Sequence, residues 1–286
     1  MDNYSIPRRI WRIIYPILIF LGVQFGIAFI IGIGAGVFAA VQQVASGADA
    51  VDFLAVIEEV VMTVLDNAML IVLVSNLVNL AIFTPIWIKT RRRLEPSSNK
   101  GPLASGLLIA GFFAGLNIVL ILFISLADIM RFFPSYEEVA EKLTQGSFMM
   151  QVISVGIAAP IVEEMVFRGV LMGRMRWLPA WASVLIQAVS FGLMHLNPFQ
   201  SLYALVVGVL LGLIYVKFRS IIMVIAGHIA FNLTSVLLSE LMPEEFMWLA
   251  VLLGIAATGI CAILTVIRPS AAVARTEQGP VEFEPL

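Results

Sequence analysis

Eight apolar stretches dominate this sequence, and most are long enough to cross a lipid bilayer. A hydrocarbon core of about 30 Å requires about 20 apolar residues in a helix. Hydrophobic residues make up 60% of the 286 residues and charged residues only 13%, whereas about a quarter of the residues in a soluble domain are charged. The sequence therefore predicts an all-α, polytopic transmembrane helical bundle of about eight spans whose main partner is the lipid bilayer. The expected spans are Ile10–Ala40, Ala68–Ile88, Leu103–Met130, Phe148–Met175, Pro179–Leu196, Phe199–Tyr215, Ile221–Leu238 and Phe246–Ile267.

The charges between these stretches predict the orientation of the chain. Basic residues favour the cytoplasmic side of a membrane, and they gather before the first span and after the second, fourth, sixth and eighth. The alternate loops are mainly acidic. This pattern predicts a multi-pass protein of the cell membrane with both termini in the cytoplasm. The first apolar run is too long for a signal peptide, and no basic stripe suggests a nucleic acid partner.

Three regions follow from the distribution of polar residues. Residues 1–147 are expected to hold three spans with their outer loops, residues 148–245 a core of four spans, and residues 246–286 the last span and a cytoplasmic tail. The polar tail from Pro269 is expected to be disordered. The segment Phe132–Gly146 is expected to form a short amphipathic helix at the outer surface.

Three ionisable residues of the fourth span lie deep in the expected membrane. A charged group costs about 2.5–3.5 kcal/mol at a helix centre on insertion scales, so it indicates a functional site. Glu163 precedes Arg174, at the expected cytoplasmic end, by about 16 Å of helix. Glu164 and Arg168 are four residues apart and share a helix face, so we expect them to pair. Glu163 projects about 100° away without a local cation, which makes it the better proton acceptor.

The only two histidines of the chain lie in the same half as these carboxylates. His228 and Asn232 are four residues apart and present polar atoms on one face of the seventh span. His228 lies about 14 Å from the inner end of its span, close to the depth of Glu163. His195 lies about 24 Å along the fifth span from Pro179, so a helix tilt or break must bring it toward the others.

In this order, the polar residues resemble the motifs of the CPBP intramembrane proteases, the family of type II CAAX prenyl endopeptidases and bacteriocin-processing enzymes. Two glutamates, three residues and an arginine match Glu163, Glu164 and Arg168. Phe-x-x-x-His matches Phe191 and His195, and His-x-x-x-Asn matches His228 and Asn232.

The resemblance covers about Phe148–Leu238 and implies an intramembrane endopeptidase that cleaves a membrane-associated protein or peptide. It further implies that Glu163 and His195 activate a water molecule, and that His228 and Asn232 stabilise the oxyanion. Arg168 would orient Glu164.

Other chemistries fit some of these residues. Two histidines and two glutamates could bind zinc, but there is no His-Glu-x-x-His pattern, so we expect no cofactor. A family member without catalytic activity could act as a membrane scaffold or in bacteriocin immunity. A transporter could use the same buried carboxylates, but such proteins often have repeated halves, and the sequence contains no internal repeat.

We predict the orientation of each loop from its charge. Reporter fusions after Arg93, Arg176 and Arg268 should give a cytoplasmic signal, and fusions near Asp52 and Glu138 an external one, because positive charge is retained in the cytoplasm. Paired reporters that are active on opposite sides of the membrane provide the measurement. A cytoplasmic signal at Glu138 would contradict the arrangement of eight spans.

Overall fold

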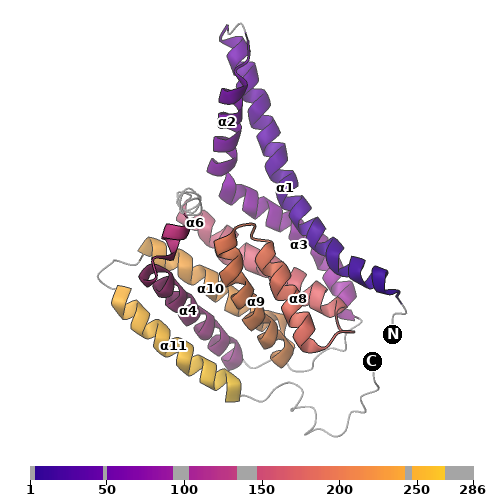
Figure 1. The fold of residues 1–286 in the computed structure, drawn as a ribbon, viewed down its shortest axis with the longest axis vertical. Helices are drawn as coiled ribbons and strands as arrows, with labels where there is room; N and C mark the ends of the chain where they lie inside the picture. Colours follow the sequence, from indigo (N-terminus) through magenta and orange to yellow (C-terminus); the bar gives the residue numbers. More distant parts are fainter. Residues whose placement is uncertain (1–3, 48–49, 93–102, 134–146, 242–246, 268–286) are drawn as a thin grey trace.

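The computed structural model describes residues 4–47, 50–92, 103–133, 147–241 and 247–267, and these residues form helices and no strand. Seven of the helices are long and apolar enough to cross a membrane, so the chain is a multi-pass helical bundle, as predicted (Figure 1). The helices are α1 (Ile6–Ala45), α2 (Phe53–Asp66), α3 (Ala68–Arg92), α4 (Leu103–Leu126), η1 (Ile129–Phe132), α6 (Phe148–Gln151), η2 (Val152–Ala158), α7 (Ala159–Glu164), η3 (Met165–Met172), α8 (Ala180–Leu193), α9 (Pro198–Phe218), α10 (Ile221–Leu241) and α11 (Met247–Ile267).

Each of the eight apolar stretches forms a helix, but the fifth is shorter than expected. Helix α8 has 14 residues, or about 21 Å, because it ends at Leu193, before the left-handed backbone of Leu196 (φ 54°). Helix α2 is a further difference, since its residues are expected to form a loop. Asp52 caps α2 by accepting hydrogen bonds from the backbone N–H groups of Leu54 and Ala55. The expected amphipathic helix and the tail lie mostly outside the described residues.

The segments α6, η2, α7 and η3 form one continuous helix, which we call the central helix (Phe148–Met172). Within its most apolar window, 56% of the residues are buried, against at most 33% in the other long helices. Val162, Val166 and Phe167 of this helix pack in one cluster with Phe20 of α1 and Phe83 of α3. The most polar of the long helices is therefore the one best shielded from lipid.

Helix α2 and the second half of α1 form an antiparallel pair that projects beyond the other helices (Figure 1). Gly32 and Gly36 of α1 allow close packing, because a Cβ atom at either position would lie 3.1–3.4 Å from the side chain of Val60 in α2. Most outward-facing side chains of the pair are apolar, for example Phe38 and Leu54, which are 62% and 78% exposed, although Glu58 and Glu59 of α2 are also exposed. Such a surface suits contact with lipid rather than water.

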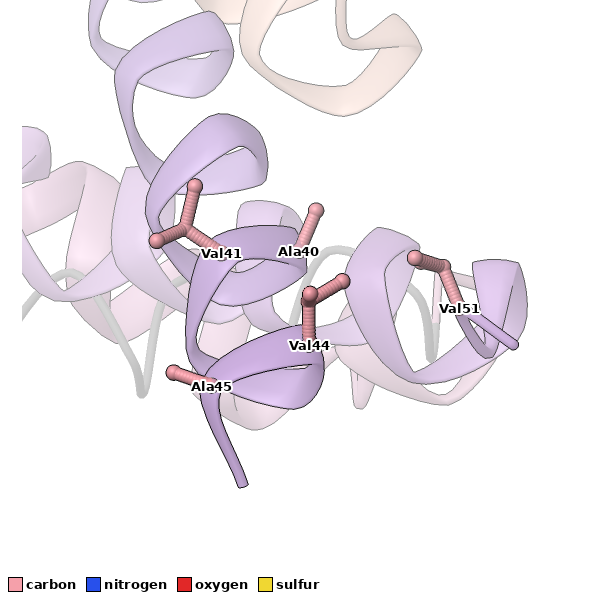
Figure 2. Close-up of a pocket in the computed structure, with 5 residues that line it drawn as sticks. All are labelled: Ala40, Val41, Val44, Ala45 and Val51. Atoms are coloured by element: carbon pink, nitrogen blue, oxygen red, sulfur yellow. The ribbon is translucent and has the colours of Figure 1, made fainter. Parts of the chain in front are cut away.

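A small pocket lies at the free end of this helix pair (Figure 2). It is lined only by Ala40, Val41, Val44, Ala45 and Val51. Without a polar or ionisable group, this pocket has nothing to activate a substrate, so the chemistry must be sought elsewhere in the chain.

Arg174 connects the C-terminal end of the central helix to α1. Pro16 lacks an N–H group, so the carbonyl of Arg12 loses its helical donor, and Arg174 Nη1 donates to that carbonyl at 2.7 Å. Arg174 Nη2 donates to the Tyr15 hydroxyl at 2.6 Å. Burial lowers the pKa of Arg174, and Tyr15 acts in the opposite direction. The first half of α1 is thereby fixed to the helix that carries the candidate site.

Helices α4 and α11 approach most closely at Gly115. A Cβ atom there would lie 2.6 Å from the Gly254 carbonyl oxygen and 2.5 Å from Thr258 Oγ1. Thr258 Oγ1 is itself hydrogen-bonded to the Gly254 carbonyl. Because the obstacle includes backbone, a side chain at position 115 must separate the two helices.

We predict that Gly115→Ala destabilises the bundle, whereas Gly106→Ala in the same helix does not. A Cβ atom at Gly106 meets nothing within 4 Å, and alanine favours a helix over glycine by up to about 1 kcal/mol. Overpacking at Gly115 should cost about 1–3 kcal/mol. Thermal unfolding of both variants in the same detergent provides the measurement, and equal midpoints would contradict the close packing of α4 and α11.

Candidate active site

Glu164 pairs with Arg168 inside the central helix, as their spacing predicts. Arg168 Nη1 donates to Glu164 Oε1 at 2.7 Å, and both side chains are fully buried. Arg168 Nη2 donates to the Gly208 carbonyl of α9 at 3.0 Å, and the guanidinium lies over the Phe191 ring at 5.0 Å. The cation is thus held by a carboxylate, a backbone carbonyl and an aromatic face, which offset part of the loss of water; Arg168 Nε and Glu164 Oε2 have no hydrogen-bond partner among the described residues.

His228 connects the two adjacent glutamates. Its Nδ1 atom lies 2.7 Å from Glu164 Oε1 and its Nε2 atom 3.6 Å from Glu163 Oε2. The paired carboxylate accepts, so Nδ1 carries a proton. The 3.6 Å separation is too long for a good hydrogen bond, so Nε2 is not committed to Glu163. One ring nitrogen is therefore fixed by Glu164, and the other is free to serve a third group.

Glu163 differs from Glu164 in its surroundings. Its side chain is 17% exposed, whereas that of Glu164 is completely buried. Arg168 pairs with Glu164 at 2.7 Å, whereas Glu163 lies 3.6 Å from His228 Nε2. Glu163 and His228 therefore form a pair that can exchange a proton beside a fixed ion pair.

His195 joins this group through Phe191. Its ring packs edge-to-face on Phe191 at 5.0 Å between centroids, and His228 packs on the same ring at 5.7 Å. His195 Nδ1 lies 2.8 Å from the Phe191 carbonyl, which can only accept, so Nδ1 carries the proton. In the neutral ring Nε2 is then a proton acceptor. No ion pair joins His195 to Glu163, although both residues are described by the structure.

Asn232 compensates for a missing backbone donor in the central helix. In η2 the hydrogen bonds join residues five apart, and the last runs from Ala159 N–H to the Ser154 carbonyl. Pro160 has no N–H to continue this series to Val155. Asn232 Nδ2 donates to the Val155 carbonyl instead, at 2.9 Å. An amide nitrogen has two N–H groups, so a second donor of Asn232 remains.

Two π-helical segments, η2 and η3, flank the glutamate pair. Such segments are rare and are frequent at functional sites, but the residue pattern does not reveal them. The sequence analysis also does not single out Gln187, a fully buried polar residue of α8 that donates to the same Gly208 carbonyl as Arg168. Its position as a polar residue within an apolar stretch is the signal that could have identified it.

The donors that could bind zinc are partly engaged with one another. Glu164 Oε1 is bound by Arg168 and by His228 Nδ1. Among the described residues, no group of three or more His, Cys, Asp or Glu side chains is arranged to hold a metal ion. Glu164 and Arg168 form an ion pair, and His228 lies between Glu164 and Glu163, at 2.7 and 3.6 Å from them.

Comparison with known protein families agrees with this arrangement. Residues 145–234 match the family described as type II CAAX prenyl endopeptidase Rce1-like. The match covers less than half of the chain, from just before the central helix into α10, and it includes all seven motif residues. No curated protein and no solved structure matches the chain. Residues 145–234 are thus similar to the Rce1-like type II CAAX prenyl endopeptidases, which confirms the resemblance indicated by the three motifs.

Proposed function

We propose that the protein is an intramembrane endopeptidase that hydrolyses a peptide bond of a membrane-associated protein or peptide. The observation that carries this proposal is the unequal environment of two adjacent glutamates. Arg168 binds Glu164 at 2.7 Å, while Glu163 lies partly exposed and 3.6 Å from His228 Nε2. One carboxylate is fixed as an ion, and the other is placed to exchange protons.

Glu163 is the group that accepts a proton from the hydrolytic water, assisted by the free Nε2 acceptor of His195. The resulting hydroxide attacks the carbonyl carbon of the scissile bond. When the tetrahedral intermediate collapses, the carbon–nitrogen bond breaks and Glu163 returns its proton to the leaving amine. A single carboxylate in this role typically contributes about 10²–10⁴-fold to the rate.

His228 and Asn232 stabilise the oxyanion in this mechanism. In its protonated form His228 donates Nδ1–H to Glu164 and holds Nε2–H available, because the contact with Glu163 is long. Asn232 contributes the N–H group that Val155 does not use. Fixed donors directed at a developing charge typically contribute about 2.7–4 kcal/mol each.

The Glu164–Arg168 pair supports this chemistry without taking part in proton transfer. Glu164 keeps the proton of His228 on Nδ1, so that Nε2 faces Glu163. Without Arg168, two adjacent carboxylates would compete for one histidine in a region of low dielectric constant. The pair therefore gives the two consecutive residues different roles: Glu163 acts as the base, and Glu164 is the structural anion.

The cleavage test uses the full chain in detergent with a panel of quenched membrane-associated peptides, some carrying a prenylated cysteine and others an unmodified apolar segment. We expect the wild type to cleave at least one class and Glu163→Ala to cleave none. A strong chelator should leave the rate unchanged; activity that is lost and then restored only by zinc would indicate a metallopeptidase. No cleavage of any peptide by a folded wild type would favour a scaffold or a transporter.

A second prediction separates the two glutamates. Glu163→Gln should lower the cleavage rate by about 10²–10⁴-fold without loss of stability, because this carboxylate makes no close ion pair. Glu164→Gln should lower both the cleavage rate and the stability, since it leaves Arg168 buried and unpaired at a cost of about 3–5 kcal/mol.

The double variant Glu164→Gln, Arg168→Met is the control for this comparison. It should recover stability, because no buried charge is left, but not activity, because His228 loses its carboxylate. Cleavage rates beside thermal midpoints provide the measurement. A Glu164→Gln variant that is stable but inactive, beside an active Glu163→Gln, would exchange the two roles.

A further inference from the structure

The backbone carbonyl of Gly208 in α9 accepts two side-chain hydrogen bonds. Arg168 Nη2 donates from the central helix at 3.0 Å, and Gln187 Nε2 donates from α8 at 2.8 Å. Gln187 Nε2 also donates to the Val184 carbonyl at 2.9 Å. Both neighbours are acceptors, so the amide can present only its NH₂ group to them. Gly208 is therefore a junction at which three helices meet through hydrogen bonds.

Glycines in α9 make room for this junction. A Cβ atom at Gly212 would lie 2.6 Å from Gln187 Nε2, and one at Gly208 would lie 3.2 Å from Ala188 Cα. A side chain at position 212 would therefore displace the amide of Gln187 from its acceptors. Glycine at positions 208 and 212 therefore allows both the close packing of α8 on α9 and the observed position of the Gln187 amide.

Helix packing alone does not require an amide at position 187. The side chain is fully buried, and apolar residues pack helices in a membrane without the cost of removing an amide from water. The position of the Gln187 amide indicates a further role, because it donates to the Gly208 carbonyl, which also accepts from Arg168. From Gly208 the contacts continue through Arg168 to Glu164 Oε1 and then to His228 Nδ1.

We propose that Gln187 is a positioning residue that acts on His228 through Arg168 and Glu164. By holding the Gly208 carbonyl, Gln187 fixes the point to which the guanidinium is anchored. The guanidinium in turn fixes the carboxylate oxygen that keeps the proton of His228 on Nδ1. The inference rests on the proposed function, because His228 is a catalytic residue only in that mechanism, but its contacts can be tested without any substrate.

The test compares Gln187→Leu and Gly212→Ala with a matched control, Ser183→Ala. Ser183 is a buried residue of the same helix that donates to the Met175 carbonyl and has no hydrogen bond to Arg168 or Gly208 among the described residues. Each full-length variant is measured in detergent for kcat, KM and thermal midpoint. We expect both test variants to lower kcat by about 2- to 10-fold, as for the loss of a hydrogen bond between neutral groups. KM should change by less than about twofold, because the interaction acts in the transition state. Ser183→Ala should affect only stability.

A spectroscopic measurement follows His228 directly. The chain has two histidines, so ¹⁵N-labelled histidine gives two pairs of imidazole signals, from Nδ1 and Nε2 of each ring, and His195→Gln identifies the pair that belongs to His228. The signals of His228 should move in Gln187→Leu and Gly212→Ala and stay in place in Ser183→Ala. If they stay in place in all three folded variants, or if kcat is unchanged in Gln187→Leu, the proposal is wrong. If they move while the wild type cleaves no peptide, the positioning role stands and the proposed function is wrong.

Discussion

A guanidinium and a carboxylate buried in the same membrane helix must neutralise each other, because both side chains are fully buried and out of reach of bulk water. Arg168 and Glu164 satisfy this constraint one helical turn apart. Their pairing determines which oxygen of Glu164 is presented to His228 and leaves the neighbouring glutamate without a cation. The different roles proposed for Glu163 and Glu164 follow from this single contact. Because the cation is buried, it also needs the Gly208 carbonyl and the Phe191 ring around it.

The central helix can carry this polar cluster because the other helices shield it. Phe20, Phe83 and Phe191 reach it from α1, α3 and α8, so the charged residues face protein rather than lipid. Pro160 leaves a backbone carbonyl of the central helix without its helical donor, and Pro16 does the same in α1. Asn232 donates to the first of these carbonyls and Arg174 to the second. Irregular backbone in a membrane helix is tolerated where neighbouring groups restore its hydrogen bonds.

The sequence predicts well those features that depend on one helix alone. The apolar stretches locate the helices, and the i, i+4 spacing of Glu164 and Arg168 predicts their contact. Features that depend on several helices are less accessible. The depth of His195 was estimated along a straight helix from Pro179, whereas the structure brings it to the site through the ring of Phe191. Gln187 could not be identified because its importance lies in an acceptor on another helix. Helix α2 was missed because 14 residues in an acidic context resemble a loop.

The shortness of α8 has a consequence for the surrounding membrane. Fourteen residues extend about 21 Å, whereas the hydrocarbon core is about 30 Å thick. A helix with this hydrophobic mismatch is accommodated by thinning of the bilayer or by polar groups that reach toward it. Residues 194–197, which include His195, follow the end of this helix, so we expect any thinning of the bilayer to lie beside the candidate site. A substrate peptide that enters from the headgroup level would have less hydrocarbon to cross beside α8 than beside any of the full-length spans that the structure describes.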